Sequence, residues 1–573
     1  MSNFNLFNSI RVKKPGRTNF DLSHEVKLSA KMGHLLPILC QEVVPGDRWK
    51  GSSEIFIRLA PMLAPLMHRI NCYVHYFFVP NRLIWDGWEE FITGGEDGQN
   101  SDVVPTLRVV GNKKLVTPII GPETLADYLG VTYANDTLTD VENRDFSFNA
   151  LPFRAYQLIF NEYYRDQNLE DPVPISKKSG VEIILPNSEI VKLRRRAWEK
   201  DYFTSALPDP QRGPDVTLPI GSTAPIRYKV DGGLTVVRRP GTGDPVFPQG
   251  QNPATGARSP FLSPISMPSG STSQKGNQLN VFTPDVAPDG VTSAVQSNGT
   301  VNIDNSSNLE VDLSGARATT INDLRRAIKL QEWLEKSARS GSRYVEQILS
   351  HFGVRSSDAR LQRPEYLGGG VTNVQVSDVI QQTQTSATDG NLLASPMGSL
   401  AGYGISVGNT NKFKRFFEEH GYIIGIMSIR PRIAYQQGLP RMFSRQSKFD
   451  FYWPEFAHLG EQEIYQREIF CQGKGSEDGK LFGYTPRYAE YKFIPSTVHG
   501  EFRTNLNFWH LGRIFSAPPK LNREFVTVGA DDESRASLNR VFADMNDSAK
   551  FYCQILNKIV AKRPMPRYGT PLI

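Results

Sequence analysis

A chain of 573 residues is long enough for several ordinary domains, or for one core that carries large insertions. Its 65 basic and 59 acidic residues give a formal net charge of +6, which is small for this length and excludes a dedicated, strongly basic nucleic-acid binder. The apolar runs are too short for a signal peptide or a membrane span, so we expect a soluble protein that is not exported.

The positive charge is concentrated at the two ends of the chain. Residues 1–20 have no acid and four bases, which gives +4: Arg11, Lys13, Lys14 and Arg17. Residues 548–573 have no acid and five bases, which gives +5: Lys550, Lys558, Lys562, Arg563 and Arg567. Since +6 less +4 and +5 leaves −3, the rest of the chain is slightly acidic. We expect basic N-terminal (1–20) and C-terminal (548–573) arms that contact a polyanion, although solvated tails would have the same composition.

Strand signals begin soon after the first arm. Residues 54–60 alternate apolar and polar side chains, and residues 70–79 are apolar or aromatic on both faces, as expected for a strand with both faces buried. Further strand-like segments are YIIGIMSIRPRIAY (422–435), FDFYWPEF (449–456), YAEYKFIP (488–495) and VHGEFRTNL (498–506). Proline and glycine interrupt them throughout, which favours antiparallel β architecture with long connections over a βαβ succession.

Helix signals are fewer. Residues 320–339 place Leu324, Ala327, Leu330 and Leu334 in one apolar stripe, with Thr320 or Asn322 as a possible cap. A short helix is predicted over Arg343–Phe352, ended by Gly353, and another over Leu151–Asn168. We expect these helices to cover a β core.

Residues 241–310 differ from the rest of the chain. They contain seven charged residues, no Trp, Tyr or Cys, and many Gly, Pro, Ser, Thr and Asn. Such a segment is either a disordered linker or a small β-rich projection that neighbouring copies stabilise. We place an insertion over 221–319, which divides the core into a first part, 21–220, and a second part, 320–547.

No pattern predicts catalysis, a cofactor or a metal. The four cysteines, Cys40, Cys72, Cys471 and Cys553, are far apart in sequence. On a strand, Cys72 and His75 point to opposite faces, so a structural role is expected for both residues and for the nearby His68. The run Gly368, Gly369 and Gly370 lacks the Lys-Ser/Thr or helix that a phosphate-binding loop needs. We interpret these glycines as positions where the backbone turns or packs closely.

A basic and aromatic segment follows at 411–420. It interleaves Lys412, Lys414 and Arg415 with three phenylalanines, a mixture that could neutralise phosphates and stack bases. An amphipathic segment with buried phenylalanines and solvated bases has the same pattern, and we favour that interpretation.

The glycine run ends the segment SRYVEQILSHFGVRSSDARLQRPEYLGGG, which resembles a signature of the major capsid proteins of microviruses, small icosahedral single-stranded DNA bacteriophages, and in particular of the gokushovirus branch. Other blocks resemble the same family, and together they cover more than half of the chain: 20–50, 60–95, 151–173, 193–213, 342–370, 428–445, 451–466, 486–503 and 564–573.

This resemblance implies a mainly β fold, an eight-stranded antiparallel jelly roll of the viral capsid type, with long inserted loops and a few covering helices. It implies a structural protein, not an enzyme, that self-assembles in sixty copies into a T=1 shell around circular single-stranded DNA. The insertion would form an external protrusion at the three-fold axes and is a candidate surface for host attachment. The protein would belong to the virion and assemble in the cytoplasm of a host bacterium.

The implied partners are further copies of the chain, the DNA genome, a small basic DNA-binding protein, a minor or pilot capsid protein and a host surface receptor. No membrane insertion is expected. The candidate DNA-contacting residues are the following: Arg11, Lys13, Lys14, Arg17, Lys412, Lys414, Arg415, Lys558, Lys562, Arg563 and Arg567.

Two other classes of function remain as alternatives. A β-rich, lectin-like carbohydrate-binding module would also use a jelly roll, but it would normally be exported. A DNA-processing enzyme would need a metal or nucleophile constellation, and the sequence does not provide one.

Overall fold

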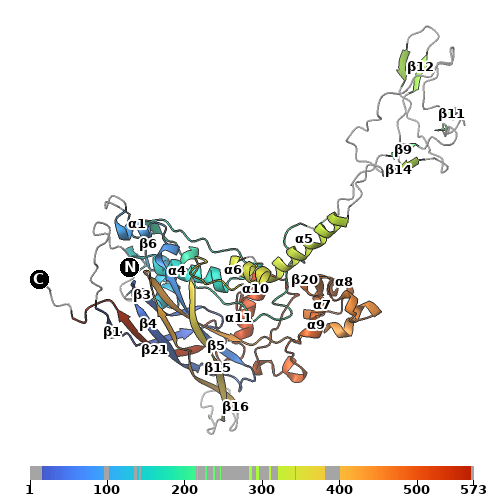
Figure 1. Ribbon diagram of the computed structural model, residues 1–573. Helices are drawn as coiled ribbons and strands as arrows, with labels where there is room; N and C mark the ends of the chain where they lie inside the picture. Colours follow the sequence, from blue (N-terminus) through green and yellow to red (C-terminus); the bar gives the residue numbers. More distant parts are fainter. Residues whose placement is uncertain are drawn as a thin grey trace. The chain divides into compact units, whose positions relative to one another are not determined.

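The computed structural model describes residues 16–95, 102–133, 139–140, 143–214, 216, 321–341, 343–380 and 400–568, together with six short strands between 226 and 311 (Figure 1). Two compact units are present. One contains residues 1–215 and 331–573, and the other contains residues 216–330, which include the whole of the expected insertion. No helix in the described part of the chain is long and apolar enough to cross a membrane.

The larger unit is built on one antiparallel, curled sheet whose strands pair from the two ends of the chain inward. Strand β2 pairs with β21, β3 with β18, β4 with both β16 and β17, and β5 with β15. This nested pairing is the topology of a jelly roll, so the predicted fold is confirmed. The strands are β1 (Thr18–Asp21), β2 (His24–Ala30), β3 (Leu36–Val43), β4 (Arg48–Leu59), β5 (Ile70–Pro80), β15 (Glu365–Ile380), β16 (Leu400–Asn409), β17 (Phe413–Phe416), β18 (Gly421–Pro431) and β21 (Phe551–Arg563).

Two halves of this sheet enclose the main core. The first half has the order β1/β2, β21, β4 and β16/β17, and the second half has the order β15, β5, β18 and β3. Side chains alternate along β4, so that Trp49, Ile55 and Ile57 are buried while Arg48 and Lys50 are exposed. The buried side meets Val74 of β5 in one hydrophobic cluster. The opposite side of the first half therefore carries its polar residues.

The central strands of the second half of the sheet, β5 and β18, are covered on both faces. Phe77 and Val79 of β5 belong to a second hydrophobic cluster with Ile424 of β18 and with Phe153 and Tyr156 of helix α4 (Leu151–Ile159). This arrangement confirms the prediction that residues 70–79 form a strand without a solvent-facing side. The Tyr156 hydroxyl donates a hydrogen bond of 2.9 Å to the Leu35 carbonyl and so joins the covering helix to the sheet.

The first long insertion connects β5 to β15. Its elements in the larger unit are η1 (Asn81–Leu83), α1 (Trp88–Thr93), β6 (Thr106–Gly111), α2 (Lys113–Ile120), α3 (Leu125–Leu129), β7 (Arg144–Asn149), α4, the π-helix η3 (Phe160–Tyr164), β8 (Val181–Ile183), η4 (Glu189–Val191), α6 (Tyr344–Gln347) and the π-helix η6 (Ile348–Phe352). Helix α5 (Ile321–Ser340) begins in the smaller unit and ends in the larger one. The smaller unit contains the pairs β9 (Ile226–Tyr228) with β14 (Leu309–Val311), β10 (Val237–Arg238) with β11 (Pro245–Val246), and β12 (Thr283–Val286) with β13 (Thr292–Val295).

The three predicted helices are present, but one does not cover the core. Helix α5 spans the predicted segment, yet Leu324 and Leu330 of its apolar stripe are half exposed, and only Ser337 and Ala338 are buried. The helix is amphipathic, and Leu324 and Leu330 on its apolar side are exposed among the described residues. Gly353, with a φ of 68°, ends the helix over 343–352 as expected.

Three strand predictions are wrong in the second long insertion, which lies between β18 and β21. Segments 449–456, 488–495 and 498–506 form short helical turns, because Pro454, Pro495 and Gly500 interrupt any strand ladder. The elements are η7 (Arg441–Ser444), η8 (Lys448–Asp450), η9 (Pro454–Phe456), β19 (Glu461–Tyr465), α7 (Gln466–Ile469), α8 (Gly475–Asp478), β20 (Leu481–Pro486), α9 (Ala489–Lys492), η10 (Gly500–Arg503), η11 (Asn507–Trp509), α10 (Arg523–Val526) and α11 (Asp532–Asn539).

The glycine run lies within β15, not in a loop. The register with β5 shifts between Tyr366 and Gly368, and Gly368 has a φ of 146°, so it occupies a bulge. A Cβ atom on Gly369 would collide with the backbone carbonyl oxygen of Val74 in β5. The two strands could not keep their present separation with a larger residue at this position.

We predict that Gly369→Ala lowers the free energy of unfolding by about 1–3 kcal/mol, because the new methyl group overpacks a central strand pair. Gly475→Ala is the control, since a Cβ atom there meets no atom within 4 Å and should change stability by less than about 0.5 kcal/mol. Denaturant unfolding of the unassembled chain measures both values. Equal stability of the two variants would contradict the close-packing role of Gly369.

Candidate nucleic-acid interface

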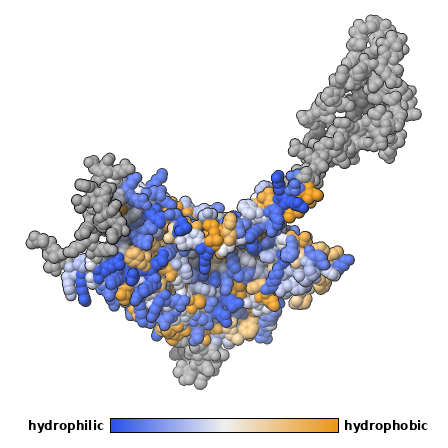
Figure 2. Space-filling model, in the orientation of Figure 1, coloured by the Kyte–Doolittle hydropathy of each residue, from blue (hydrophilic) through white to orange (hydrophobic). Residues whose placement is uncertain are grey.

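The outer face of the first half of the sheet offers exposed cationic side chains. Arg48 and Lys50 lie on β4, Lys414 on β17 and Lys562 on β21, and all four are exposed. We call these four residues the cationic face. Figure 2 shows hydrophilic residues, in blue, interspersed with apolar ones over the region that Figure 1 labels β1, β4 and β21.

The strand register brings like charges side by side. Lys562 of β21 is paired with Arg48 of β4, and Lys50 of β4 is paired with Lys414 of β17. Directly opposed side chains in antiparallel strands lie close together, and like charges in this arrangement destabilise a sheet. None of the four has an ion pair with another described residue. The pattern therefore suits a site that an external anion neutralises.

An aromatic ring completes this surface. Phe416 of β17 is 39% exposed and is paired with Arg48 across the strands. The guanidinium carbons of Arg17 and Arg48 lie 5.4 and 6.0 Å from the centre of its ring. Cations around a half-exposed ring are suited to a single-stranded polyanion with aromatic bases, because the phosphates meet charge and the bases can stack.

The remaining residues of the basic and aromatic segment have separate roles. Phe413 and Phe417 are buried, which agrees with the amphipathic interpretation, while Lys412 is exposed just before β17. Arg415 forms an ion pair of 2.6 Å with Glu365 of β15. The structure thus separates this segment into two core side chains, one ion-paired base and a cationic group on the open face.

The expected C-terminal arm is mostly a strand. β21 continues to Arg563 in the middle of the first half-sheet, between β1/β2 and β4, so that only the residues after it could form an arm. Lys558 is ion-paired with Glu54 on the outer face. The guanidinium carbon of Arg563 lies 5.1 Å from the ring centre of Trp49, and its Nε is 3.4 Å from the Asp47 carboxylate. These two bases are therefore partly neutralised within the chain.

Three of the predicted candidates, Arg11, Lys13 and Lys14, lie outside the described residues. Arg17 lies next to Phe416, as described above, and Arg567 lies near Tyr568, with its guanidinium carbon 5.9 Å from the ring centre. Sequence reasoning missed Arg48 and Lys50. Their signal was available, because the two bases flank the buried Trp49 with the period of two that marks one face of a strand.

The histidine and cysteine side chains considered as metal ligands are packed within the protein. A ring nitrogen of His75 hydrogen bonds the Tyr164 hydroxyl at 2.8 Å, and burial lowers the pKa of His75 to about 4. Cys72 is buried, and burial raises its pKa above that of an ordinary thiol. No three His, Cys, Asp or Glu side chains in the described part of the chain are grouped to hold a metal ion.

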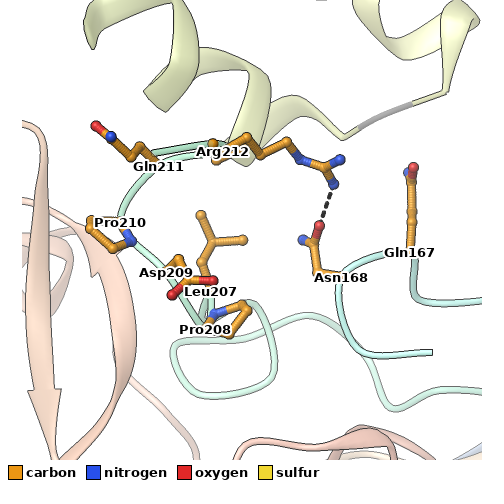
Figure 3. Close-up of a pocket in the computed structure, with 10 residues that line it drawn as sticks. Gln167, Asn168, Leu207, Pro208, Asp209, Pro210, Gln211 and Arg212 are labelled. Atoms are coloured by element: carbon orange, nitrogen blue, oxygen red, sulfur yellow. Dashed lines mark hydrogen bonds between the residues drawn. The ribbon is translucent and has the colours of Figure 1, made fainter. Parts of the chain in front are cut away.

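A cavity of about 450 Å³ lies where the loop 207–213 meets Gln167 and Asn168 (Figure 3). Arg212 donates a hydrogen bond to the Asn168 side-chain oxygen and so spans part of the cavity. The lining that the structure describes has one carboxylate, Asp209, and lacks histidine, cysteine and lysine. Such a lining does not provide the nucleophile and base that covalent catalysis needs.

Comparison with known proteins gives a consistent result. The family model described as "Capsid protein (F protein)" matches residues 8–573. Capsid protein VP1 of Chlamydia phage 1 is 36% identical over 99% of this chain and 97% of its own, and that of Bdellovibrio phage phiMH2K is 38% identical over 97% and 95%. Capsid protein VP1 of Spiroplasma virus 4 is 30% identical over 97% and 95%. With its jelly-roll fold, the chain belongs to the F-protein family of microvirus major capsid proteins.

Proposed function

We propose that this capsid protein assembles in sixty copies into a T=1 icosahedral shell that encloses a circular single-stranded DNA genome. Membership of the capsid family makes the protein a structural component of the virion and not an enzyme. The cationic face carries the DNA part of the proposal. Its unpaired like charges, next to the half-exposed Phe416, favour binding of a flexible, aromatic polyanion.

The smaller unit is proposed as the host-attachment surface. It is a separate compact unit within the first insertion, so its contacts lie mainly within itself. A part of the chain with this independence can change without disturbing the core, which suits a surface that must match a receptor. The proposal also includes assembly in the cytoplasm of a host bacterium.

Further partners follow from the charge of the cationic face. Lys558 and Arg563 are engaged by acids of the chain, so these two bases are less available to the genome. We therefore include a small basic DNA-binding protein that neutralises further phosphates, together with a minor or pilot capsid protein. The glycine run is proposed to hold β15 and β5 together, not to bind a ligand.

We predict that changing Arg48, Lys50, Lys414 and Lys562 together to Gln reduces DNA retention and its dependence on salt. For single strands, each lost phosphate contact should lower the slope of log affinity against log salt by about 0.7. The measurement is the affinity of the purified chain for oligothymidylate across a salt series.

The matched control changes four ion-paired bases away from this face: Arg108, Lys192, Lys200 and Lys480. It removes the same formal charge. If both quadruple variants show the same salt slope, general charge and not the cationic face governs DNA binding, and the proposed contact is wrong.

The same face gives a prediction in the absence of DNA. Lys414→Gln removes one of two opposed cations, so the free energy of unfolding should rise by about 0.2–1 kcal/mol. Added salt should narrow the difference, because it screens exposed charges. Lys480→Gln, which breaks an exposed ion pair with Glu477, should not stabilise the protein. A destabilised Lys414→Gln chain would show that the opposed cations do not repel.

Replacement of residues 221–319 by a flexible Gly/Ser linker tests the role of the insertion. The replaced residues lie within the smaller unit, so the core should unfold at the same denaturant concentration and particles should still form. Adsorption to host cells should fall to the background value. Normal adsorption by particles that contain only the shortened chain would refute the attachment role.

A further inference from the structure

Four arginine side chains converge in the second insertion, away from the cationic face. They line a cavity of about 220 Å³ and come from different segments: Arg441 from η7, Arg445 from the loop after it, Arg467 from α7, and Arg487 from the residue after β20. Figure 1 shows α7, α9 and β20, the elements around this cavity, close together. We call it the arginine cavity.

The carboxylates of the cavity do not neutralise all four guanidinium groups. Two acids, Asp450 and Glu490, are part of the lining. Glu490 is shared, because its Oε1 lies 3.8 Å from Nε of Arg441 and 3.4 Å from Nη2 of Arg445. Asp450 accepts hydrogen bonds of 2.9 and 2.7 Å from the backbone N–H groups of Gln446 and Ser447. Arg441 has a further acid partner outside the lining, because its Nη1 lies 3.4 Å from Oε1 of Glu468. The four cations are therefore opposed by three acids, all of which already have partners.

Arg467 and Arg487 have no acid partner among the described residues. Each of them lies against an aromatic ring. The guanidinium carbon of Arg467 is 5.2 Å from the ring centre of Tyr465, and that of Arg487 is 4.9 Å from the ring centre of Tyr488. The Nε atoms of both residues, and that of Arg445, are buried without a hydrogen-bond partner in the described structure. An unsatisfied buried donor on a charged group is costly, so a ligand that accepts from these groups would stabilise the site.

We propose that the arginine cavity is a phosphate-binding site. A phosphate group presents several anionic oxygens, and a guanidinium group binds two of them through paired N–H donors. A single carboxylate has only two oxygens and cannot serve four arginines in this way. With Glu468 counted beside the two acids of the lining, one positive charge remains in excess, which favours an anion such as phosphate over a neutral ligand. A volume of about 220 Å³ has room for one phosphate group and accompanying waters.

The rim of the cavity suggests how a larger phosphate compound would bind. Phe449 lines the cavity and is 55% exposed, and Tyr452 and Trp453 on the same segment are about half exposed. Exposed rings beside a phosphate site can stack bases, so the phosphate could belong to a single-stranded DNA backbone as well as to free phosphate. The lining of this cavity shares no residue with the cationic face.

The test uses the full-length chain with inorganic phosphate and with short oligothymidylate. Phosphate binding is measured by calorimetry against chloride at equal ionic strength, and oligothymidylate binding by fluorescence anisotropy. In Arg467→Gln/Arg487→Gln, we expect phosphate to bind at least about tenfold more weakly, since each lost charged hydrogen bond has an effect of this size. The control, Lys474→Gln/Lys480→Gln, removes two exposed charges nearby and should bind phosphate as the parent does.

The arms of the experiment separate the sources of the phosphate. If oligothymidylate competes with phosphate for the parent protein, and this competition is absent in the arginine variant, the ligand is a DNA backbone. Phosphate binding without such competition identifies free phosphate. Phosphate that binds no better than chloride, or equally well to both double variants, overturns the proposal. The proposal is also overturned if the parent does not bind phosphate and the arginine variant does not assemble into particles. In that case the cavity would hold an acidic side chain of a second copy.

A folding control keeps this result interpretable. Arg467→Lys/Arg487→Lys preserves the charge but removes the two-pronged geometry, so it should fold and bind phosphate with an intermediate affinity. If the glutamine variant does not fold, the phosphate affinity of the lysine variant tests the proposal. Parent-like phosphate affinity in a folded lysine variant would count against the guanidinium geometry and against the proposal.

Discussion

The pairing of the last strand with the first strands closes the first half of the sheet and fixes which side chains share its outer face. β21 forms backbone hydrogen bonds with β4 on one side and with β1 and β2 on the other, so the ends of the chain must meet before the first half-sheet is complete. The cationic face is a consequence, because Lys562 comes to lie beside Arg48 only through this pairing. The basic C-terminal segment is therefore part of the sheet as far as Arg563.

Arginine residues connect the inserted segments to this sheet. Arg343 donates hydrogen bonds of 2.5 and 3.1 Å to the carbonyl oxygens of Asn161 and Arg165, and so joins the segment before β15 to the end of the α4 region. Arg196 lies 4.1 Å from the ring centre of Tyr73 and donates a bond of 2.7 Å to Ser428, which ties a third segment to β5 and β18. Blocks of the larger unit that are far apart in the sequence thus meet over one half-sheet and are held there by charged hydrogen bonds and ring contacts.

Part of this architecture could be predicted from the sequence. Residues 70–79 were interpreted correctly because a strand buried on both faces has an apolar pattern that few other elements share. The central position of β21 is harder to predict, because the concentrated positive charge of 548–573 is typical of an arm while the alternation of Phe551, Cys553 and Ile555 is typical of a half-buried strand. In the second insertion, aromatic-rich segments have the composition of strands, but their rings pack against arginine side chains. Arg445, for example, contacts the rings of Phe451 and Tyr491. The arginine cavity could not be predicted, since four separate segments build it and no local spacing marks them.

We propose that the open face of the first half-sheet contacts single-stranded DNA, and an electron cryo-microscopy reconstruction of the intact, DNA-filled particle tests this contact directly. We expect the face to line the inside of the shell, with nucleic-acid density within contact distance of Arg48, Lys50, Lys414 and Phe416. A shell in which these side chains face the exterior, or in which another protein surface covers them completely, would rule out the contact.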